Sequence, residues 1–415
     1  MRSLRPARRS VVAELLILVE SNTTGSGRLF AERARDLGLV PALLCADPAR
    51  YPYAAELDLP VHRCDTAALP TVLAHCRDLA RSQQVVGVTS SSEYFIATAA
   101  AVARALDLPG EDPDRLAAAR SKSVQRARFA ATGVASPGFQ VVTSAADAVD
   151  AAQRLGLPVV VKPVSRSGSI GVRRCDDLRG VAAHAADLLA TRTDERGLPL
   201  PSAVLVERYL PGPEFSVELL DGEVRMVVAK HVDETRGFLE IGHDVPAPVE
   251  SGTAELLAES ARAALAALGL RWGAAHVELR VTGGRAVVVE VNPRLAGGMI
   301  PQAIRVATGQ DLIAELVARS AGRVPPPQTV RNGYASVRFL VPTADGVVET
   351  VPDPASALAL PGVVDAVVTA RPGRRIVRLG SFLERLGYVI AQGRSAAEAG
   401  ARADRAVAAL PVAIG

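Results

Sequence analysis

Several classes of protein are excluded by what this sequence lacks. The four cysteines of the 415-residue chain have neither Cys-x-x-Cys spacing nor paired histidines nearby, so neither a zinc site nor a disulfide framework is expected. No apolar run reaches the roughly 18 residues that indicate a transmembrane helix. The 47 Lys and Arg residues nearly balance the 44 Asp and Glu residues, so no overall field favours nucleic acid or an anionic membrane. We therefore expect a cytoplasmic protein with reduced thiols that binds neither nucleic acid nor membranes.

The N-terminus has some features of a signal peptide. Four arginines within the first nine residues precede an apolar run that ends at Val19. Glu14 interrupts that run, however, and no small-x-small cleavage site follows it. We expect a basic tail that leads into a first buried strand.

Length and periodicity predict more than one domain. A chain of 415 residues with 49% hydrophobic residues is too long for one ordinary core. Near the N-terminus, apolar strands alternate with helical patterns, as in β-α-β units. The expected elements are strands 15–19, 40–44 and 85–89 and helices 27–37 and 94–106. The predicted fold class is therefore α/β, with a doubly wound, Rossmann-like domain over residues 1–112.

Two turns of this domain follow strands at the sheet edge where open α/β sheets bind ligands. Residues 21–27 leave backbone amides free at a helix N-terminus, where an anion could sit, but the Gly-x-Gly-x-x-Gly fingerprint is missing. A tight turn with an N-cap and a substrate-contacting turn both fit this segment. Glu93 follows a Thr-Ser-Ser-Ser run and is either the N-cap or first-turn acid of the next helix or a substrate contact.

A lysine and a loop rich in glycine and serine follow the strand expected at residues 159–162. Lys162 ends the strand, and residues 163–172, the Gly/Ser loop, supply small side chains and free backbone amides that can hold phosphate oxygens. The Walker pattern is absent, because the lysine precedes the loop instead of following it. A hairpin without any function would have the same composition.

A predicted hairpin carries the groups expected to bind a metal. Two β-branched runs flank a Thr-Gly-Gly turn, and period-2 alternation puts Glu290 and Asn292 on one face with Arg294 at the strand's exit. Carboxylate and amide oxygens are the ligands that Mg²⁺ prefers, and water and nucleotide phosphates usually complete its shell. Two edge strands with solvated acids are the simpler interpretation, but the pattern, taken with the lysine loop, favours a use of ATP.

The connecting loop decides whether Glu278 joins this site. Cross-strand partners share a face of a sheet, so Glu278 and Glu290 lie together only if the loop has an odd number of residues or if a bulge compensates. A two-residue glycine turn would pair Thr282 with Arg285 and separate the acids. A three-residue loop would pair Val281 with Arg285 and place Glu278 diagonal to Glu290. We expect the odd loop or a compensating bulge.

Five segments, taken in order, resemble the ATP-grasp superfamily of carboxylate–amine ligases, over roughly residues 13–395. They are residues 121–134, 161–172, 206–216, 276–278 and 290–294. The resemblance implies an ATP-grasp domain of α+β structure over residues 113–330, with a lid subdomain at about 137–206. A small α+β C-terminal domain would follow over residues 331–415.

The resemblance also implies roles for single residues. Lys122 and Lys162 would hold the nucleotide phosphates, and Arg294 would face the acyl phosphate, so Lys162 and Arg294 are the expected catalytic residues. The other implied nucleotide contacts are Ser165, Ser167, Gly168, Ser169, Glu207, Arg208, Tyr209, Leu210 and Glu214. Residues 207–210 would form the adenine hinge and Glu214 would hold the ribose. Glu278, Glu290 and Asn292 would coordinate Mg²⁺, or Mn²⁺ in its place.

Within the superfamily, residues 292–301 are most similar to L-amino acid ligases, which make dipeptides and related amides. The implied reaction joins a small-molecule carboxylate to an amine through an acyl phosphate, with release of ADP and phosphate. Biotin carboxylase is the competing resemblance, but the Gly/Ser loop lacks its run of glycines and the residues after Arg294 lack its Gln-Val-Glu-His. The candidate substrate contacts are Glu93, Glu240, His243, Gly297 and Gly298.

Alternatives from other classes are weaker. A non-catalytic nucleotide-binding partner is disfavoured because both lysines and the metal-binding groups are retained, and an oxidoreductase is disfavoured by the missing glycine fingerprint. His231 and His276 are expected to be core or strand residues. A homodimer is the alternative to a monomer.

Overall fold

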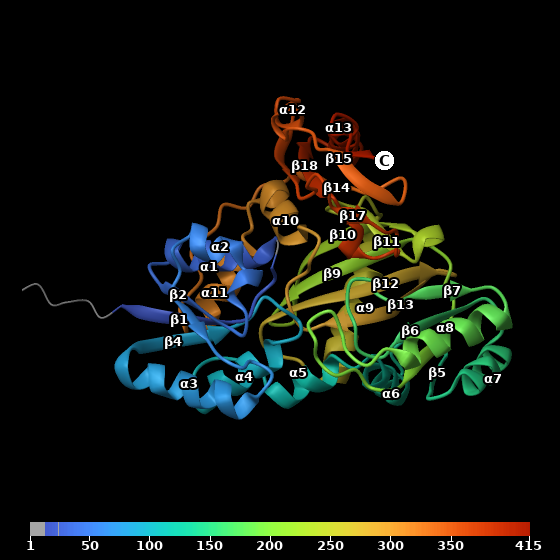
Figure 1. Cartoon of the computed structure of the whole chain (residues 1–415), viewed down its shortest axis with the longest axis horizontal. Coiled ribbons are helices and arrows are strands. Elements are labelled where there is room, and N and C mark those ends of the chain that lie inside the picture. Colours follow the sequence, from blue (N-terminus) through green and yellow to red (C-terminus); the bar gives the residue numbers. More distant parts are fainter. Residues whose placement is uncertain (1–12, 24) are drawn as a thin grey trace, which may run out of the picture. The chain divides into compact units, whose positions relative to one another are not determined.

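The structure is a computed structural model that describes residues 13–23 and 25–415. The basic tail expected at residues 1–12 lies outside the described residues. The chain divides into two compact units, Met1–Pro113 with Ile313–Pro326 and Asp114–Leu312 with Pro327–Gly415, whose elements are drawn in Figure 1. The division into three domains stays a prediction. No helix among the described residues is long and apolar enough to span a membrane.

The first unit contains a parallel four-stranded sheet in the order β3-β2-β1-β4. Its elements are β1 (Glu14–Val19), β2 (Val40–Cys45), β3 (Val61–Arg63), β4 (Gln84–Thr89), α1 (Ser26–Asp36), α2 (Pro52–Glu56), α3 (Leu69–Ser82), α4 (Ile96–Ala105) and α11 (Leu312–Ser320). All of β1 from Leu15 onward is buried, because a parallel strand covered on both faces is apolar throughout. The predicted doubly wound α/β fold is confirmed, with β3, α2, α3 and α11 added to the expected elements.

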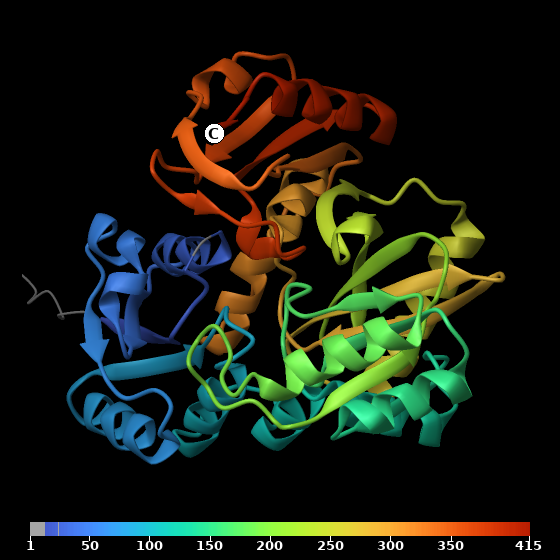
Figure 2. The same ribbon diagram turned by 45° about the vertical axis from the view of Figure 1, so that its right-hand side comes forward.

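The second unit begins with two helices and a small antiparallel sheet in the order β5-β8-β6-β7. The elements are α5 (Pro113–Ala119), α6 (Lys122–Thr132), β5 (Phe139–Val142), α7 (Ala145–Leu155), β6 (Val159–Pro163), β7 (Arg173–Cys175), α8 (Leu178–Ala190) and β8 (Val204–Arg208). Helices α7 and α8 lie side by side against the sheet (Figure 2), where buried small residues such as Ala148 and Ala185 let them pack closely. The Gly/Ser loop joins β6 to β7.

An eight-stranded antiparallel sheet dominates the second unit, in the order β13-β12-β9-β10-β11-β14-β18-β16. Its strands are β9 (Glu214–Leu220), β10 (Glu223–Asp233), β11 (Leu239–Val245), β12 (Ala274–Thr282), β13 (Arg285–Asn292), β14 (Tyr334–Leu340), β16 (Val363–Val368) and β18 (Gly387–Gly393). The helices that pack on it are α9 (Ser251–Leu268), α10 (Ile300–Thr308) and α13 (Ala396–Ala408). Strands β14, β16 and β18 come from the C-terminal region, which therefore extends the sheet that carries the predicted hairpin.

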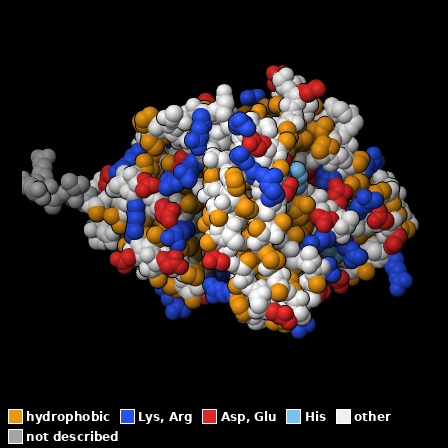
Figure 3. Space-filling view, turned by 90° about the horizontal axis from the view of Figure 1, so that it is seen from above, with side chains coloured by type: hydrophobic (Ala, Val, Ile, Leu, Met, Phe, Trp, Pro, Cys, Tyr) orange, Lys and Arg blue, Asp and Glu red, His pale blue; other side chains and the backbone are white. Residues whose placement is uncertain are grey.

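The rest of the C-terminal region forms a three-stranded sheet in the order β17-β15-β19. The remaining elements are β15 (Gly346–Thr350), α12 (Ala355–Leu358), β17 (Arg375–Ile376), β19 (Ala413–Ile414) and the short 3₁₀ helices η1 (Pro48–Arg50), η2 (Glu234–Arg236) and η3 (Phe382–Glu384). A core that includes Val348, Val389 and Leu410 holds this region together. On the face drawn in Figure 3, basic and acidic side chains are interspersed, in keeping with the small net charge.

The hairpin of β12 and β13 has a two-residue turn and a bulge. Thr282 pairs with Arg285, and both intervening glycines have positive φ, as a type I′ turn requires. The three-residue loop with a diagonal arrangement, one of the two possibilities that the sequence left open, is therefore wrong. The register shifts between Glu278 and Leu279, so that Val289 is an extra residue on β13 and Glu278 lies directly opposite Glu290. The alternative prediction of a compensating bulge is confirmed.

Strand β13 is the edge of the large sheet, and its outer side is covered by polar groups from α6 and the following loop. The N–H of Val288 donates to the carbonyl of Ala135 at 2.8 Å. Gln125 accepts from the N–H of Val291 at 2.9 Å and donates to its carbonyl at 2.8 Å, and Arg126 donates to the carbonyl of the bulged Val289 at 2.5 Å. These bonds satisfy an edge that would otherwise be open to pairing, and they fix the strand on which Glu290 and Asn292 lie.

Candidate active site

The bulge brings the metal-binding candidates to one face of the hairpin. Glu278 and Glu290 are cross-strand partners, and Asn292 lies two residues beyond Glu290. The Oδ1 atom of Asn292 is buried without a hydrogen-bond partner among the described residues, which is costly unless a ligand supplies one. Among residues 13–23 and 25–415, no three His, Cys, Asp or Glu side chains are grouped to hold a metal. Two carboxylates and one amide oxygen nevertheless fit Mg²⁺, which takes its other ligands from phosphates and water.

The two predicted phosphate-binding lysines face carboxylates. Lys122 opens α6 behind the N-cap Ser121, and its Nζ lies 2.8 Å from Glu290 Oε1 and donates to the carbonyl of Arg166 in the Gly/Ser loop at 2.5 Å. Lys162 ends β6 and lies 2.6 Å from Glu207 Oε2. Burial lowers the pKa of Lys162, although Glu207 opposes this effect. The structure thus brings Lys122 to Glu290, a predicted metal ligand, and to the Gly/Ser loop, and it brings Lys162 to the predicted hinge.

Glu207 joins Lys162 to Arg126 in a buried ion triad. Its Oε1 lies 2.5 Å from Arg126 Nε, and all three side chains are at most 4% exposed. Burial alone would raise the pKa of Glu207, but Arg126 and Lys162 bring it below the ordinary value. Glu207 is therefore a carboxylate anion, and its two ion pairs hold the end of β8, where the predicted hinge begins, against α6 and β6.

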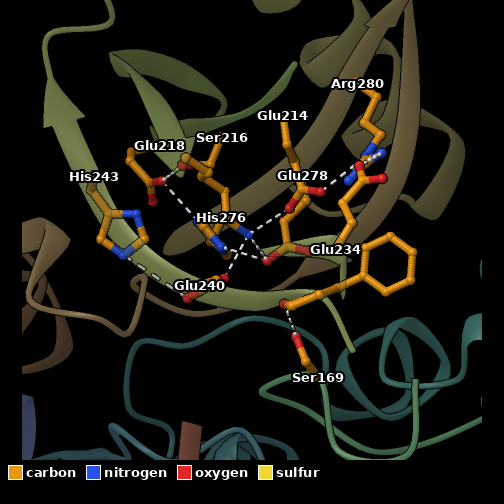
Figure 4. A network of polar contacts seen from close by, with 12 residues as sticks. Ser169, Glu214, Ser216, Glu218, Glu234, Glu240, His243, His276, Glu278 and Arg280 are labelled. Atoms are coloured by element: carbon orange, nitrogen blue, oxygen red, sulfur yellow. Dashed lines mark hydrogen bonds and ion pairs between the residues drawn. The ribbon is translucent and has the colours of Figure 1, made fainter. Parts of the chain in front are cut away.

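The predicted hinge and ribose acid are held by an arginine that no sequence motif indicated. Arg280 on β12 donates to the carbonyl of Leu210 at 2.8 Å, to Glu214 Oε2 at 3.0 Å and to Glu234 Oε1 at 2.6 Å. Tyr209 donates to the other oxygen of Glu234 at 2.5 Å. Arg208 is exposed at the end of β8, and no side-chain contact with the described residues places it at the site. Arg280 therefore joins Glu214 to the turn that contains Glu234 (Figure 4), and it also holds the backbone at Leu210.

Lys230 on β10 is the second site residue that no sequence motif indicated. Its Nζ lies 3.0 Å from Glu214, 2.7 Å from Glu240 and 2.8 Å from Glu278. Burial disfavours its charge, but the three carboxylates outweigh burial and raise the pKa of Lys230 well above the ordinary value. It thus links the predicted ribose acid, a predicted substrate acid and a predicted metal ligand.

A compositional signal could have identified Lys230. Only three of the 47 Lys and Arg residues are lysines, and Lys122, Lys162 and Lys230 are all buried. Lysine is almost never fully buried unless it is paired, and its compact ammonium is not interchangeable with a guanidinium. A chain that uses arginine nearly everywhere keeps lysine at these three positions, which indicates sites where arginine does not fit.

His276 is a buried strand residue, as expected, but its ring also contacts a predicted metal ligand. Its Nδ1 lies 2.8 Å from Glu218 Oε1, which accepts from the hydroxyl of Ser216 at 2.7 Å, and its Nε2 lies 3.1 Å from Glu278 Oε1. Burial lowers the pKa of His276, but Glu218 and Glu278 outweigh burial and bring it to about 9. The imidazolium therefore orients the carboxylate of Glu278 (Figure 4).

Three of the candidate substrate residues lie together. Glu240 on β11 pairs with Lys230 and lies 2.9 Å from Arg385, and His243 Nε2 lies 3.9 Å from Glu240. His243 is fully buried, and neither ring nitrogen has a hydrogen-bond partner in the described part of the chain. A Cβ at Gly298 would lie 2.6 Å from His243 Nε2, and Gly298 has a φ of +59°, so only glycine fits there. Gly297 has open space where its Cβ would lie.

Glu93 lies in the first unit, in the turn between β4 and α4, and is 8% exposed. The N-cap of α4 is Phe95 and its first turn has no acid, so the expectation that Glu93 is the N-cap or first-turn acid of that helix is wrong. The turn over residues 21–27 has no side-chain cap either, because the N-cap of α1 is Gly25. Asn22 instead donates to Ser26 and to the carbonyl of Ser91. The substrate role of Glu93 stays a prediction.

Arg294 and the serines of the Gly/Ser loop complete the set of predicted residues. Arg294 follows β13 and donates to the carbonyl of Leu295 at 3.0 Å. Ser165, Ser167, Gly168 and Ser169 lie in the loop between β6 and β7, and the hydroxyl of Ser169 donates to the carbonyl of Phe238 at 3.0 Å. This hydroxyl is therefore bonded to the turn after β10, and the loop reaches the rest of the site (Figure 4).

The buried neutral His243 predicts a pH effect on stability. Burial lowers the pKa of His243 from 6.5 to about 3, so between these values the unfolded chain binds a proton that the folded chain does not. This contribution leaves stability intact above pH 6.5 and reduces it as the pH falls toward 3, by about 1.4 kcal/mol per unit. The variant His243→Asn should lose this contribution. Urea unfolding of both proteins between about pH 4 and pH 7 checks it; a stability difference independent of pH would contradict it.

Comparisons with known proteins identify the family. Residues 155–302 match the ATP-grasp domain, and residues 338–415 match the L-amino acid ligase C-terminal domain 2. The uncharacterized protein y4rH of Sinorhizobium fredii is 37% identical over 392 residues, which cover 94% of this chain and 81% of that protein. The chain belongs to the ATP-grasp superfamily. Its C-terminal match puts it with the L-amino acid ligases, and it is an ATP-dependent ligase.

One further relative of this ATP-grasp ligase and one solved structure with a similar fold have named activities. The alanine–anticapsin ligase of Bacillus amyloliquefaciens is 29% identical over 252 residues, which cover 55% of this chain and 52% of that protein. This ligase thus matches about half the length of that relative. The crystal structure of the L-amino acid ligase from Bacillus licheniformis superimposes with a TM-score of 0.79 at 21% identity and covers 97% of this chain and 99% of that one. The shared fold confirms the ATP-grasp architecture expected from the sequence.

Proposed function

We propose that this ligase joins the carboxylate of one amino acid to the amine of another, or of a related small molecule, through an acyl phosphate. A carboxylate oxygen attacks the γ-phosphorus of ATP and ADP leaves. The amine nitrogen then attacks the acyl carbon, phosphate leaves with the former carboxylate oxygen, and the amine loses a proton. The reaction needs positioning and electrostatic stabilisation more than a protein nucleophile.

The observation that carries this proposal is the direct opposition of Glu278 and Glu290 across the bulge, with the unpartnered oxygen of Asn292 beside them. Mg²⁺ held by these groups would neutralise charge on the transferring phosphoryl group. A bulge costs a ladder position and is usually a feature with a purpose. Without this bulge, Glu278 and Glu290 would lie on opposite faces of the sheet. With it they are cross-strand neighbours on one face, where both could bind the same cation.

The lysines supply the phosphate contacts in this proposal. Lys122 forms an ion pair with Glu290, and Lys162 forms one with Glu207. Neither lysine is therefore a buried cation without a partner before ATP binds. The nucleotide phosphates would take over part of that pairing. Arg294, at the exit of β13, would then face the acyl phosphate.

Glu240 and His243 are the proposed contacts for the amino acid substrates. Glu240 is a carboxylate in reach of a substrate ammonium, and the two free nitrogens of the buried His243 can each take one hydrogen bond. Gly298 packs directly against His243, because a Cβ there would lie 2.6 Å from Nε2. Both named relatives have an amino acid in their names, alanine in one case and L-amino acid in the other, which supports this substrate class.

A phosphate-release assay tests the proposal. The purified protein is given ATP and Mg²⁺ with single amino acids, with pairs of amino acids, and with bicarbonate, and the products are identified by mass spectrometry. Release that needs a pair and yields an amide with the mass of the two substrates less water supports the proposal. Release with bicarbonate and no amine would favour a carboxylase, and nucleotide binding without release under any condition would favour a non-catalytic partner.

Removal of either lysine should weaken the use of ATP. Lys162→Ala and Lys122→Ala each remove a point charge from the phosphates, so the KM for ATP should rise about tenfold or more and the turnover should fall. Calorimetric titration with ATP checks the binding directly. Arg154→Ala removes an exposed cation from α7 and serves as the control. Unchanged ATP affinity in both lysine variants would contradict their assignment.

A further inference from the structure

The Gly/Ser loop is seated on a turn of the C-terminal region. Gly168 has a φ of +65°, and a Cβ there would lie 2.2 Å from Cδ1 of Phe382, so the ring lies directly against the glycine. The N–H of Phe382 also donates to the carbonyl of Gly168 at 3.3 Å. The loop that is expected to cover the phosphates thus contacts an aromatic residue more than 200 positions later in the chain.

A buried acid, Glu384, holds in place the turn that contacts the Gly/Ser loop. We call this contact, of Phe382 with Gly168, the seat of the loop. Glu384 is 3% exposed, and its Oε2 accepts from the N–H groups of Leu379 and Gly380 at 2.6 and 2.9 Å. Its Oε1 lies 2.5 Å from Arg236 in the turn after β10. Glu384 therefore closes residues 379–386, the C-terminal turn, and fastens them to the segment that also receives the hydroxyl of Ser169.

The same turn holds a candidate substrate residue. Arg385 donates to Glu240 Oε2 at 2.9 Å and to the carbonyl of Glu240 at 3.0 Å, while its guanidinium stacks 3.7 Å from the centroid of the Phe339 ring. Two contacts on one residue fix both its backbone and its carboxylate. Phe382, which seats the loop, and Arg385, which fixes Glu240, are only three residues apart.

We propose that the C-terminal turn couples closure of the Gly/Ser loop to the amino acid site, with Phe382 as the positioning residue for the loop. A loop seated on Phe382 keeps water from the acyl phosphate, since attack by water would regenerate the carboxylate and release phosphate without an amide. Because Arg385 belongs to the same turn, the loop finds its seat only when Glu240 is in place. The water-excluding role of this contact rests on the ligase function proposed above, whereas the contact of the loop with Phe382 does not depend on that function.

The test compares Phe382→Ala with two matched variants. Phe382 is 37% exposed, so its loss should leave the fold intact. Leu383→Ala removes a neighbouring side chain that is 44% exposed and has no role in the seat, and Phe382→Leu keeps an apolar group against Gly168. With ATP and Mg²⁺ bound, trypsin should cut after Arg166, within the loop, on the order of five- to tenfold faster in Phe382→Ala than in the parent. Leu383→Ala should match the parent, and Phe382→Leu should lie between.

The second measurement is the ratio of phosphate released to amide formed. Phe382→Ala should raise this ratio severalfold, with little change in the KM for ATP, because the nucleotide contacts stay in place. Unchanged cleavage at Arg166 would overturn the seat, whatever the protein catalyses. Faster cleavage with an unchanged ratio in an active ligase would overturn the coupling. Failure of the parent protein to form any amide would instead count against the ligase function, and the cleavage rates would still decide the seat.

Discussion

Glu290→Gln should lower the turnover at saturating ATP and Mg²⁺ by about 100-fold or more while the protein stays folded. The substitution removes one ligand charge at constant shape, and it also removes the carboxylate that lies 2.8 Å from Lys122. Phosphate release gives the turnover, and Mn²⁺ binding followed by electron paramagnetic resonance gives the metal affinity independently of activity. Both should fall together, because Glu290 acts through the metal.

The control for this prediction makes the same chemical change at another site. Glu255 is an exposed acid on α9, and Glu255→Gln should leave both turnover and Mn²⁺ affinity unchanged. Circular dichroism of both variants should match the parent. Near-normal turnover of a folded Glu290→Gln protein at saturating Mg²⁺ would rule out the shared metal site.

Arg126→Met should destabilise the protein by about 3 kcal/mol, near the lower end of the range for a broken buried ion pair, because Lys162 stays beside Glu207. Arg126 is fully buried, pairs with Glu207 and donates to the carbonyl of the bulged Val289. Its loss leaves one carbonyl and part of one charge without a partner. Urea unfolding measures the change in free energy, and a fall in phosphate release should accompany it as the bulge loosens.

A double-mutant cycle separates the two roles of Arg126. If most of its effect passes through Glu207, then Arg126→Met combined with Glu207→Gln should cost less than the sum of the single changes. Arg128→Met changes a half-buried arginine two residues along the same helix, whose guanidinium donates to the carbonyl of Leu268, and should cost about 1 kcal/mol. If Arg126→Met and Arg128→Met lower the free energy of unfolding equally, the buried ion triad contributes no more to stability than an ordinary hydrogen bond of an arginine.

Local pattern predicted much of the frame of the site. The apolar run at residues 15–19 became the buried β1, and the lysine before the Gly/Ser loop became the end of β6. These features depend on neighbours in sequence, through side-chain alternation and the conformational freedom of glycine. The choice of hard oxygen ligands at 278, 290 and 292 was equally local, and the buried Oδ1 of Asn292 has no partner among the described residues.

The hairpin of β12 and β13 shows a feature that the local sequence pattern could not predict, namely the strand register. Parity required either an odd loop or a bulge, and the sequence favoured neither. The two glycines fit a type I′ turn, and the bulge at Val289 is held by Arg126 from a helix more than 150 residues earlier. The register of β13 was therefore decided by contacts that the hairpin itself does not contain.

The sequence by itself determined which chemical groups are candidates for the site, namely two lysines, paired acids, an amide and a loop of small residues. Only the tertiary structure decided how they meet. Lys230 contacts acids from β9, β11 and β12 because those strands are neighbours or near neighbours of β10 in the sheet order. Phe382 contacts Gly168, although the two residues lie far apart in the sequence. The physical reason is that periodicity encodes the face of a residue, whereas strand order and register follow from burial and hydrogen bonding between distant segments.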